Sequence, residues 1–230
     1  MKRTLVLSTG AICSLALAAA AETRTYDLSS FSGIDVSAGI TVNFEAGPEQ
    51  SIVAETDRGD FDKLIIEVDD DELVIRRARS NWNWGNNRDR FTVTVTAPAI
   101  DSLDASSGSS VTANGFVGDY IEISASSGAS IRASSIAGGE VELDTSSGAS
   151  LAAEGNCTRA SIDTSSGSSV SASTLECVEV FADSSSGSSV GAYATTRVVA
   201  DVSSGASVSV QGGATNVDID KSSGGSVTVS

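Results

Sequence analysis

The chain has 230 residues, with 30 acidic residues, 14 basic residues and no histidine, and its formal net charge is −16 at pH 7. An acidic balance of this size repels nucleic acid and anionic membranes, so the sequence predicts no nucleic-acid partner. The lack of histidine excludes a serine or cysteine triad of the usual kind, and it disfavours a zinc site.

Residues 1–21 are predicted to form a secretory signal peptide. Lys2 and Arg3 are followed by an apolar run and by the small-residue cleavage site Ala19-Ala20-Ala21. A membrane anchor is the alternative, but the run is short and ends in alanines, and no second apolar span of about 18 residues follows. We therefore expect an exported mature chain that does not span a membrane, in the periplasm, the cell envelope or outside the cell.

Residues 22–100 form an irregular β region in this interpretation, because they are rich in Val, Ile, Thr and Phe but lack a clear repeat. A short helical turn is expected within 57–63, a hairpin turn at 69–71, and a long exposed loop at 80–87. The strands are expected at 33–37, 39–45, 51–56, 64–68, 72–78 and 91–96.

Residues 101–230 contain Ser-Ser-Gly seven times, at intervals of 18 to 20 residues. A fixed period near twenty indicates a solenoid in which each repeat is one coil. Positions five before, three after and five after each glycine hold apolar or small residues, and the alternate positions are polar. Because that spacing is two, these side chains share one face of a strand. The third position after each glycine, for example, holds Val111, Ile131, Leu151, Val170, Val190, Val208 and Val227.

The predicted fold is therefore an all-β, right-handed parallel β-helix with about 19–20 residues per coil, since parallel crossovers are right-handed. Each glycine is expected to supply the positive φ of a corner turn. Ile34, Gly39, Val42 and Phe44 fit the register of the later coils. The N-terminal half is therefore predicted to be a wider, irregular part of the same stack.

The motifs Phe31-Ser32-Gly33-Ile34-Asp35-Val36-Ser37, Gly39-Ile40-Thr41-Val42 and Leu73-Val74-Ile75, followed by the Ser-Ser-Gly coils, resemble the putative auto-transporter adhesin, head GIN-like domain family. The resemblance covers about residues 25–225. It implies a bacterial exported β-helical protein with an adhesion role and no enzyme activity.

Two cysteines remain after signal cleavage, and each lies ten residues before a Ser-Ser-Gly glycine. Cys157 and Cys177 thus hold the same position in adjacent coils. Stacked strands lie about 4.8 Å apart, which is within the Cα separation that a disulfide spans. Because export supplies an oxidising compartment, we predict a disulfide rather than two free inward thiols.

An aspartate stands four residues before most of the glycines and would form a ladder of like charges. One interpretation is a cation such as Ca²⁺ bound by Asp144, Asp163, Asp183 and Asp201, since Ca²⁺ favours several oxygen ligands. The other, which we favour, is that each carboxylate caps the amides of its own turn. Asp35, Asp104 and Asp220 share the position, whereas Ser124 interrupts it.

Trp82 and Trp84 are candidate binding residues, because exposed aromatic side chains often anchor partners such as sugars or proteins. The alternative is that they fold back over one end of the solenoid. Acidic residues recur in every coil, as structural repeats do, so paired carboxylates of a polysaccharide-acting enzyme are disfavoured.

The leading interpretation is a non-catalytic, exported structural or adhesion-type protein that binds a surface protein or glycan through its loops or ends. A glycan- or cation-binding β-helix is the alternative. The C-terminal coil lacks an evident cap, and a second copy is expected to cover its strand edges.

Overall fold

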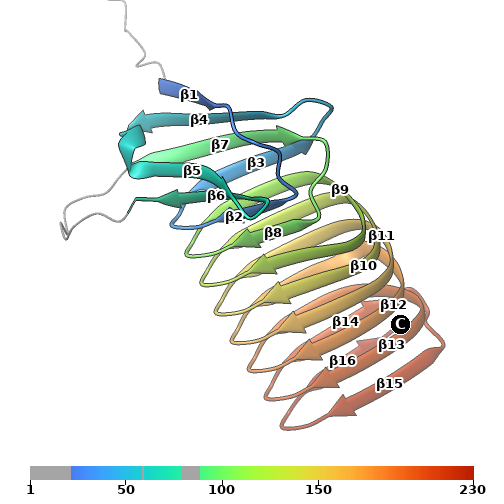
Figure 1. The fold of residues 1–230 in the computed structure, drawn as a ribbon. Helices are drawn as coiled ribbons and strands as arrows, with labels where there is room; N and C mark the ends of the chain where they lie inside the picture. Colours follow the sequence, from blue (N-terminus) through green and yellow to red (C-terminus); the bar gives the residue numbers. More distant parts are fainter. Residues whose placement is uncertain (1–21, 59, 79–88) are drawn as a thin grey trace, which may run out of the picture.

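A computed structural model describes residues 22–58, 60–78 and 89–230, and all strands in these ranges belong to a single sheet of 16 strands (Figure 1). The described elements are β1 (Glu22–Tyr26), β2 (Gly33–Val36), β3 (Thr41–Ala46), β4 (Ser51–Arg58), the 3-10 helix η1 (Phe61–Lys63), β5 (Leu64–Asp69), β6 (Glu72–Arg77), β7 (Arg90–Ala97), β8 (Ser102–Ala105), β9 (Ser110–Ala125), β10 (Ser130–Thr145), β11 (Ser150–Thr164), β12 (Ser169–Ser184), β13 (Ser189–Val202), β14 (Ser207–Gln211), β15 (Asn216–Lys221) and β16 (Ser226–Val229).

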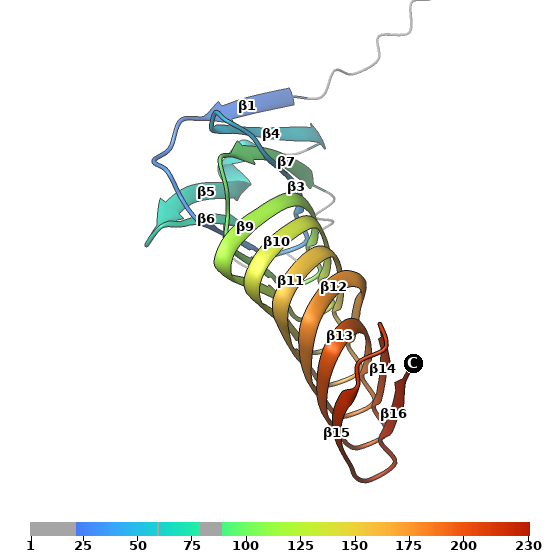
Figure 2. The same ribbon diagram turned by 90° about the vertical axis from the view of Figure 1, so that its right-hand side faces the viewer.

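The regular coils wind as a right-handed parallel β-helix, as the sequence predicts (Figures 1 and 2). Ser130 pairs with Ser150, Ser150 with Ser169, Ser169 with Ser189 and Ser189 with Ser207, so the coils repeat after 18 to 20 residues. The long strands β9 to β12 each run through a bend and continue on the next side of the coil, as Figure 2 shows.

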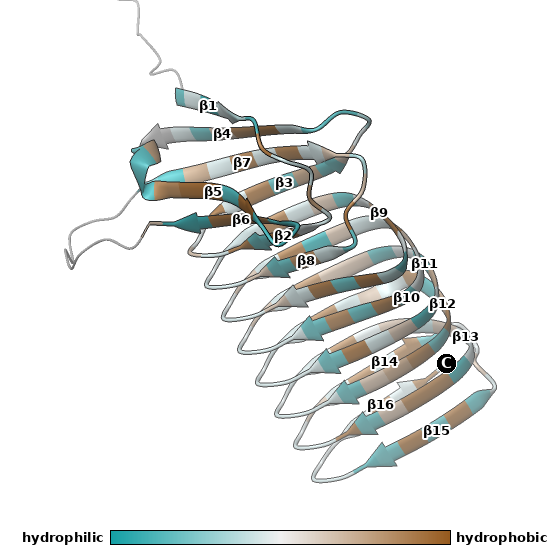
Figure 3. Cartoon of the chain, in the orientation of Figure 1, coloured by the Kyte–Doolittle hydropathy of each residue, from teal (hydrophilic) through white to brown (hydrophobic). Residues whose placement is uncertain are grey.

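The interior is a continuous apolar column along the stack. Val111, Ile131, Leu151 and Val170 lie directly over one another and are 1–3% exposed. Apolar and polar bands alternate along the strands of the regular coils in Figure 3, as the period of two requires. The side chains five residues before and five residues after each turn glycine also form columns that point inward over most of the stack. The alignment of the repeats on their glycines is therefore confirmed.

Each corner is a two-residue turn whose serine and glycine both have positive φ. In the first regular coil Ser107 has φ 53° and Gly108 has φ 73°. The Ser109 N–H donates to the Ser106 carbonyl at 3.1 Å, which closes a turn of the I′ type. The sequence predicted positive φ for the glycine only. A type I′ turn requires positive φ at both of its central residues, so the serine adopts positive φ as well as the glycine.

Two further inward positions escaped the sequence analysis: the third before each glycine and the first after it. In the middle coils they carry hydroxyl groups that bond to one another inside the rod. The Thr164 Oγ1 lies 2.8 Å from Ser184 Oγ and 3.1 Å from Ser188 Oγ, and all three residues are at most 2% exposed. Ser188 also donates to the Ser185 carbonyl at 2.6 Å. This network satisfies groups that would otherwise be buried without partners.

The N-terminal region continues the same stack, as expected, but it is not simply a wider coil. β2 pairs with β8, and β3 with β9, both in parallel, so residues 33–46 form a coil directly next to the first regular one. β6 and β7 extend these two sides. Beyond them β5 pairs with β6, β4 with β7 and β1 with β4, all antiparallel. Short connections such as the turn at Asp70 and Asp71, both at positive φ, reverse the chain where a parallel coil needs a long crossover.

Candidate binding surfaces

Two flat sides of the rod expose the polar residues that alternate with the core. The hydroxyl face is formed by the strand segments that follow each turn, and the acidic face by the segments that precede it. On the hydroxyl face one unbroken in-register column carries only serine and threonine. Its members are Thr92, Thr41, Ser110, Ser130, Ser150, Ser169, Ser189, Ser207 and Ser226.

A groove of about 280 Å³ lies on the hydroxyl face, where the strands approach the bend. The exposed side chains of Arg132 and Glu154, on adjacent coils, line it together with Thr112, Ser134 and Thr174. Within residues 22–58, 60–78 and 89–230, neither the Arg132 guanidinium nor the Glu154 carboxylate has a hydrogen-bond or ion-pair partner. The groove therefore offers free donors and acceptors over a floor of alanines.

Irregular pairing shapes this groove. The register between β10 and β11 shifts after Ala133, and that between β11 and β12 shifts after Ala152. Ser135 has φ 55°, an uncommon value for a residue other than glycine outside a turn. Bulges of this kind re-aim side chains. The sequence analysis missed the groove because Arg132 and Glu154 occupy ordinary polar places in the repeat; their isolation on a face of small residues was the available signal.

The aspartates that were predicted to form a ladder do stack on the acidic face. Asp144, Asp163, Asp183, Asp201 and Asp220 are neighbours in successive coils. Burial, then the charges of Glu142, Asp163 and Glu122, raise the pKa of Asp144 to about 6. Burial first and the charges of Asp163 and Asp201 next raise the pKa of Asp183.

Neither interpretation of the ladder gains direct support from this geometry. In the described part of the chain no group of three or more His, Cys, Asp or Glu side chains converges as a metal site would. The turn amides donate to backbone carbonyls instead of to the carboxylates: Gly148 N–H, for example, donates to the Ser166 carbonyl at 3.1 Å. The stacked carboxylates thus repel one another, which agrees with the raised pKa of Asp144.

The acidic face also carries an arginine–aromatic cluster that the sequence analysis did not single out. The guanidinium groups of Arg159 and Arg197 lie 5.2 Å and 5.5 Å from the centroid of the Phe181 ring. Arg159 is also 3.4 Å from a carboxylate oxygen of Glu179. The half-exposed Phe181 side chain is therefore held between two cations of neighbouring coils.

The predicted binding residues Trp82 and Trp84 lie outside the described residues, as does the predicted signal peptide. Their role stays a prediction. Among the described helices, none is long and apolar enough to cross a membrane.

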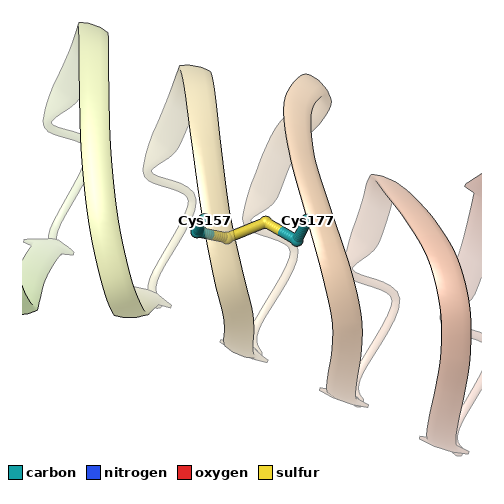
Figure 4. Close-up of a disulfide and its surroundings, with 2 residues drawn as sticks. All are labelled: Cys157 and Cys177. Carbon is teal, nitrogen blue, oxygen red and sulfur yellow. A yellow bond between two sulfur atoms is a disulfide. The ribbon is translucent and has the colours of Figure 1, made fainter.

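The predicted disulfide is confirmed. Cys157 and Cys177 pair in register on β11 and β12, and their sulfur atoms are bonded (Figure 4). Their Cα atoms are 4.6 Å apart, close to the spacing of adjacent strands. The bond joins two coils at the bend and closes a loop of 20 residues.

The fold and these surfaces define a class: a β-solenoid whose sides expose polar residues in stacked columns. Residues 30–214 match the family described as "Putative auto-transporter adhesin, head GIN domain", and the chain belongs to that family. No curated protein matches the sequence.

Solved structures share the fold at low sequence identity. A protein described as a putative adhesin from Bacteroides fragilis NCTC 9343 superposes with a TM-score of 0.83 and 16% identity, covering 92% of this chain and 97% of its own. A putative adhesin from Parabacteroides merdae ATCC 43184 gives 0.71 and 16%, covering 91% and 96%. A putative lipid binding protein from Parabacteroides distasonis ATCC 8503 gives 0.70 and 17%, covering 91% and 96%. Such likeness establishes the shared architecture.

Proposed function

We propose that the mature chain is an exported, non-catalytic adhesion-type protein that binds a glycan or a cell-surface protein. The family and the adhesin-type structural relatives support the adhesion role. The observation that carries recognition is the groove on the hydroxyl face, where unpaired charged groups of opposite sign lie on a rigid sheet.

The chemistry of the groove suits a polyhydroxylated ligand. The Arg132 guanidinium presents N–H donors, the Glu154 carboxylate presents acceptors, and serine and threonine hydroxyls do both. A few placed polar groups over an apolar floor fix the orientation of a ligand. The sheet beneath them is held by in-register backbone pairing, so little ordering is required on binding.

The tryptophans Trp82 and Trp84 are a second recognition element in this proposal, since tryptophan is enriched at binding hot spots. Export is supported by the basic and apolar segment at residues 1–21 and by the disulfide, which is typical of oxidising compartments.

A cation is the second candidate ligand, at the stacked carboxylates of Asp144, Asp163, Asp183 and Asp201. Occupied carboxylates would no longer repel one another, so Ca²⁺ would raise the melting temperature. A titration to millimolar Ca²⁺ that leaves the melting temperature unchanged removes this candidate.

A binding screen of the purified mature chain against glycans and intact bacterial surfaces tests the proposal. If the ligand lies in the groove, Arg132→Ala is expected to weaken binding at least tenfold. If it lies at the tryptophans, Trp82→Ala combined with Trp84→Ala is expected to do so. Arg159→Ala, the same substitution on the opposite face, serves as the control and should leave binding unchanged. The proposal fails if no ligand binds, or if all variants bind as the parent does.

A further inference from the structure

The straight strand segments of the hydroxyl face are almost free of charge. They pair in register along the rod, and together they contain one charged residue, Arg132. The segments are 92–95, 41–44, 110–113, 130–133, 150–153, 169–172, 189–192, 207–210 and 226–229. Packed sheets lie about 10 Å apart, and the Debye length is about 8 Å at physiological ionic strength, so the aspartates of the acidic face are largely screened here. The surface around Arg132 is therefore locally positive on a chain that is acidic overall.

The Arg132 guanidinium is exposed and takes no part in holding the fold together. Within residues 22–58, 60–78 and 89–230 it makes no hydrogen bond, ion pair or cation–π contact. Arg159 and Arg197, by contrast, both lie against the Phe181 ring. The donors of Arg132 are free for a ligand, and a guanidinium binds both oxygens of a carboxylate at once in a planar fork.

Small residues leave room next to Arg132 along the rod. The same column continues through Ala152, Ser171 and Gly191 in the following coils. The groove of about 280 Å³ meets a second hollow of about 150 Å³ there, and Arg132, Ala152 and Ser171 line both. Three coils extend over roughly 10 Å, because adjacent strands are about 4.8 Å apart. The two hollows together form a trough that suits a chain-like ligand.

Hydroxyl groups flank this trough on both sides. Ser130, Ser150 and Ser169 stack in register along one side. Ser134 and Thr174 lie on the other side, toward the bend. Serine and threonine hydroxyls both donate and accept hydrogen bonds, so they match the hydroxyl groups of successive units of a sugar chain.

Glu154 restricts where a charged group of the ligand can lie. Its exposed carboxylate belongs to the coil after that of Arg132, two residues beyond Ala152, and it has no hydrogen-bond or ion-pair partner among the described residues. A carboxylate accepts hydrogen bonds from hydroxyl groups but repels a second carboxylate. An acidic ligand therefore has to place its carboxylate on Arg132 and its hydroxyl groups toward Glu154.

We infer that the trough binds an acidic glycan, a chain of sugar units that carry carboxylates. One carboxylate lies on the Arg132 guanidinium, and the sugar chain runs along the rod over Ala152 and Ser171. This inference rests on the proposed function and narrows its ligand from glycans and surface proteins to uronic-acid glycans.

The two charged residues of the trough distinguish an acidic ligand from a basic or neutral one. For an acidic glycan, Arg132→Gln removes an attraction and Glu154→Gln removes a repulsion. For a basic ligand both effects have the opposite sign. For a neutral glycan neither substitution changes a preference between charged and uncharged ligands, because no such preference exists.

Calorimetric titration of the mature chain with hexamers of galacturonate, glucuronate and mannuronate tests the inference. Each hexamer is compared with its methyl ester, which keeps the sugar chain and removes the charge. At neutral pH and physiological ionic strength, at least one hexamer is expected to bind tenfold or more tightly than its ester. Arg132→Gln should bind acid and ester alike, and Glu154→Gln should bind the acid at least as tightly as the parent does. Arg159→Gln makes the same change of charge on the acidic face and should behave as the parent.

The inference is overturned if no acidic hexamer binds, or if each ester binds as tightly as its acid. These two comparisons use the parent chain and do not depend on the folding of a variant. It is also overturned if folded Arg132→Gln keeps the preference for the acid, or if Glu154→Gln abolishes it. The screen of glycans and bacterial surfaces decides separately on the proposed function. Binding of a neutral glycan or a surface protein alone leaves that function standing without this inference, whereas no binding at all removes both.

Discussion

Removing the disulfide should lower stability by an amount set by its loop. In the chain-entropy treatment a cross-link restricts the unfolded chain, and closing the 20-residue loop between Cys157 and Cys177 corresponds to about 3 kcal/mol at 25 °C. For a chain of this size roughly 2–4 °C accompanies each kcal/mol, so the melting temperature should fall by about 6–12 °C.

Urea unfolding of four samples measures this effect: the oxidised parent, the parent reduced with a phosphine, and Cys157→Ala/Cys177→Ala with and without reductant. The reduced parent and the variant should unfold at similar urea concentrations, well below the oxidised parent. Reductant should not affect the variant, which controls for its general effects. Equal midpoints for the oxidised and reduced parent would refute the reasoning, because the loop entropy would then not contribute.

Three further predictions follow from the interior and the acidic face. Gly155→Ala should destabilise the chain more than Gly128→Ala in thermal melts, because its new Cβ would lie 2.6 Å from the Ile136 backbone nitrogen, whereas Gly128 has open space and only an unfavourable φ of 73°. Thr164→Val should cost about 0.5–1.5 kcal/mol in urea unfolding, because Ser184 and Ser188 each lose one buried hydrogen-bond partner and keep another; an unchanged free energy of unfolding would contradict the network. The folded pKa of Asp144 is raised to about 6, above the unfolded value near 4, so the folded state binds more protons between these values. This group's contribution to stability should therefore fall as pH rises from about 4 to about 6, and Asp144→Asn should be more stable than the parent at pH 7 in a melting series; a pH profile unaltered by the substitution would contradict the assignment.

The regular coils could be predicted because one constraint repeats in every turn. A fixed period forces equivalent residues to stack, so Val111, Ile131 and Leu151 had to share a column, and Cys157 had to meet Cys177. The N-terminal coil followed from the same register, since Ile34 pairs with Leu103 and Val42 with Val111.

What the sequence did not reveal depends on contacts that do not repeat. Thr164, Ser184 and Ser188 are polar residues, so their inward positions were not apparent until their mutual hydrogen bonds were seen. The antiparallel cap has no periodic pattern to align. The groove on the hydroxyl face depends on local register shifts near Ala133 and Ala152, which a strict alignment on the turn glycines averages away.

Engineered cross-linking tests the in-register stack most directly. In the Cys157→Ala/Cys177→Ala background, Ser130→Cys with Ser150→Cys places two thiols at paired positions of adjacent coils, within the range of a disulfide. Ser130→Cys with Ala152→Cys shifts one thiol by two residues on the same face, beyond about 7 Å between Cα atoms. Mass spectrometry after mild oxidation should show a cross-link for the first pair and free thiols for the second. Efficient cross-linking of the shifted pair, with free thiols in the paired one, would contradict the stacking on which the fold and its two faces depend.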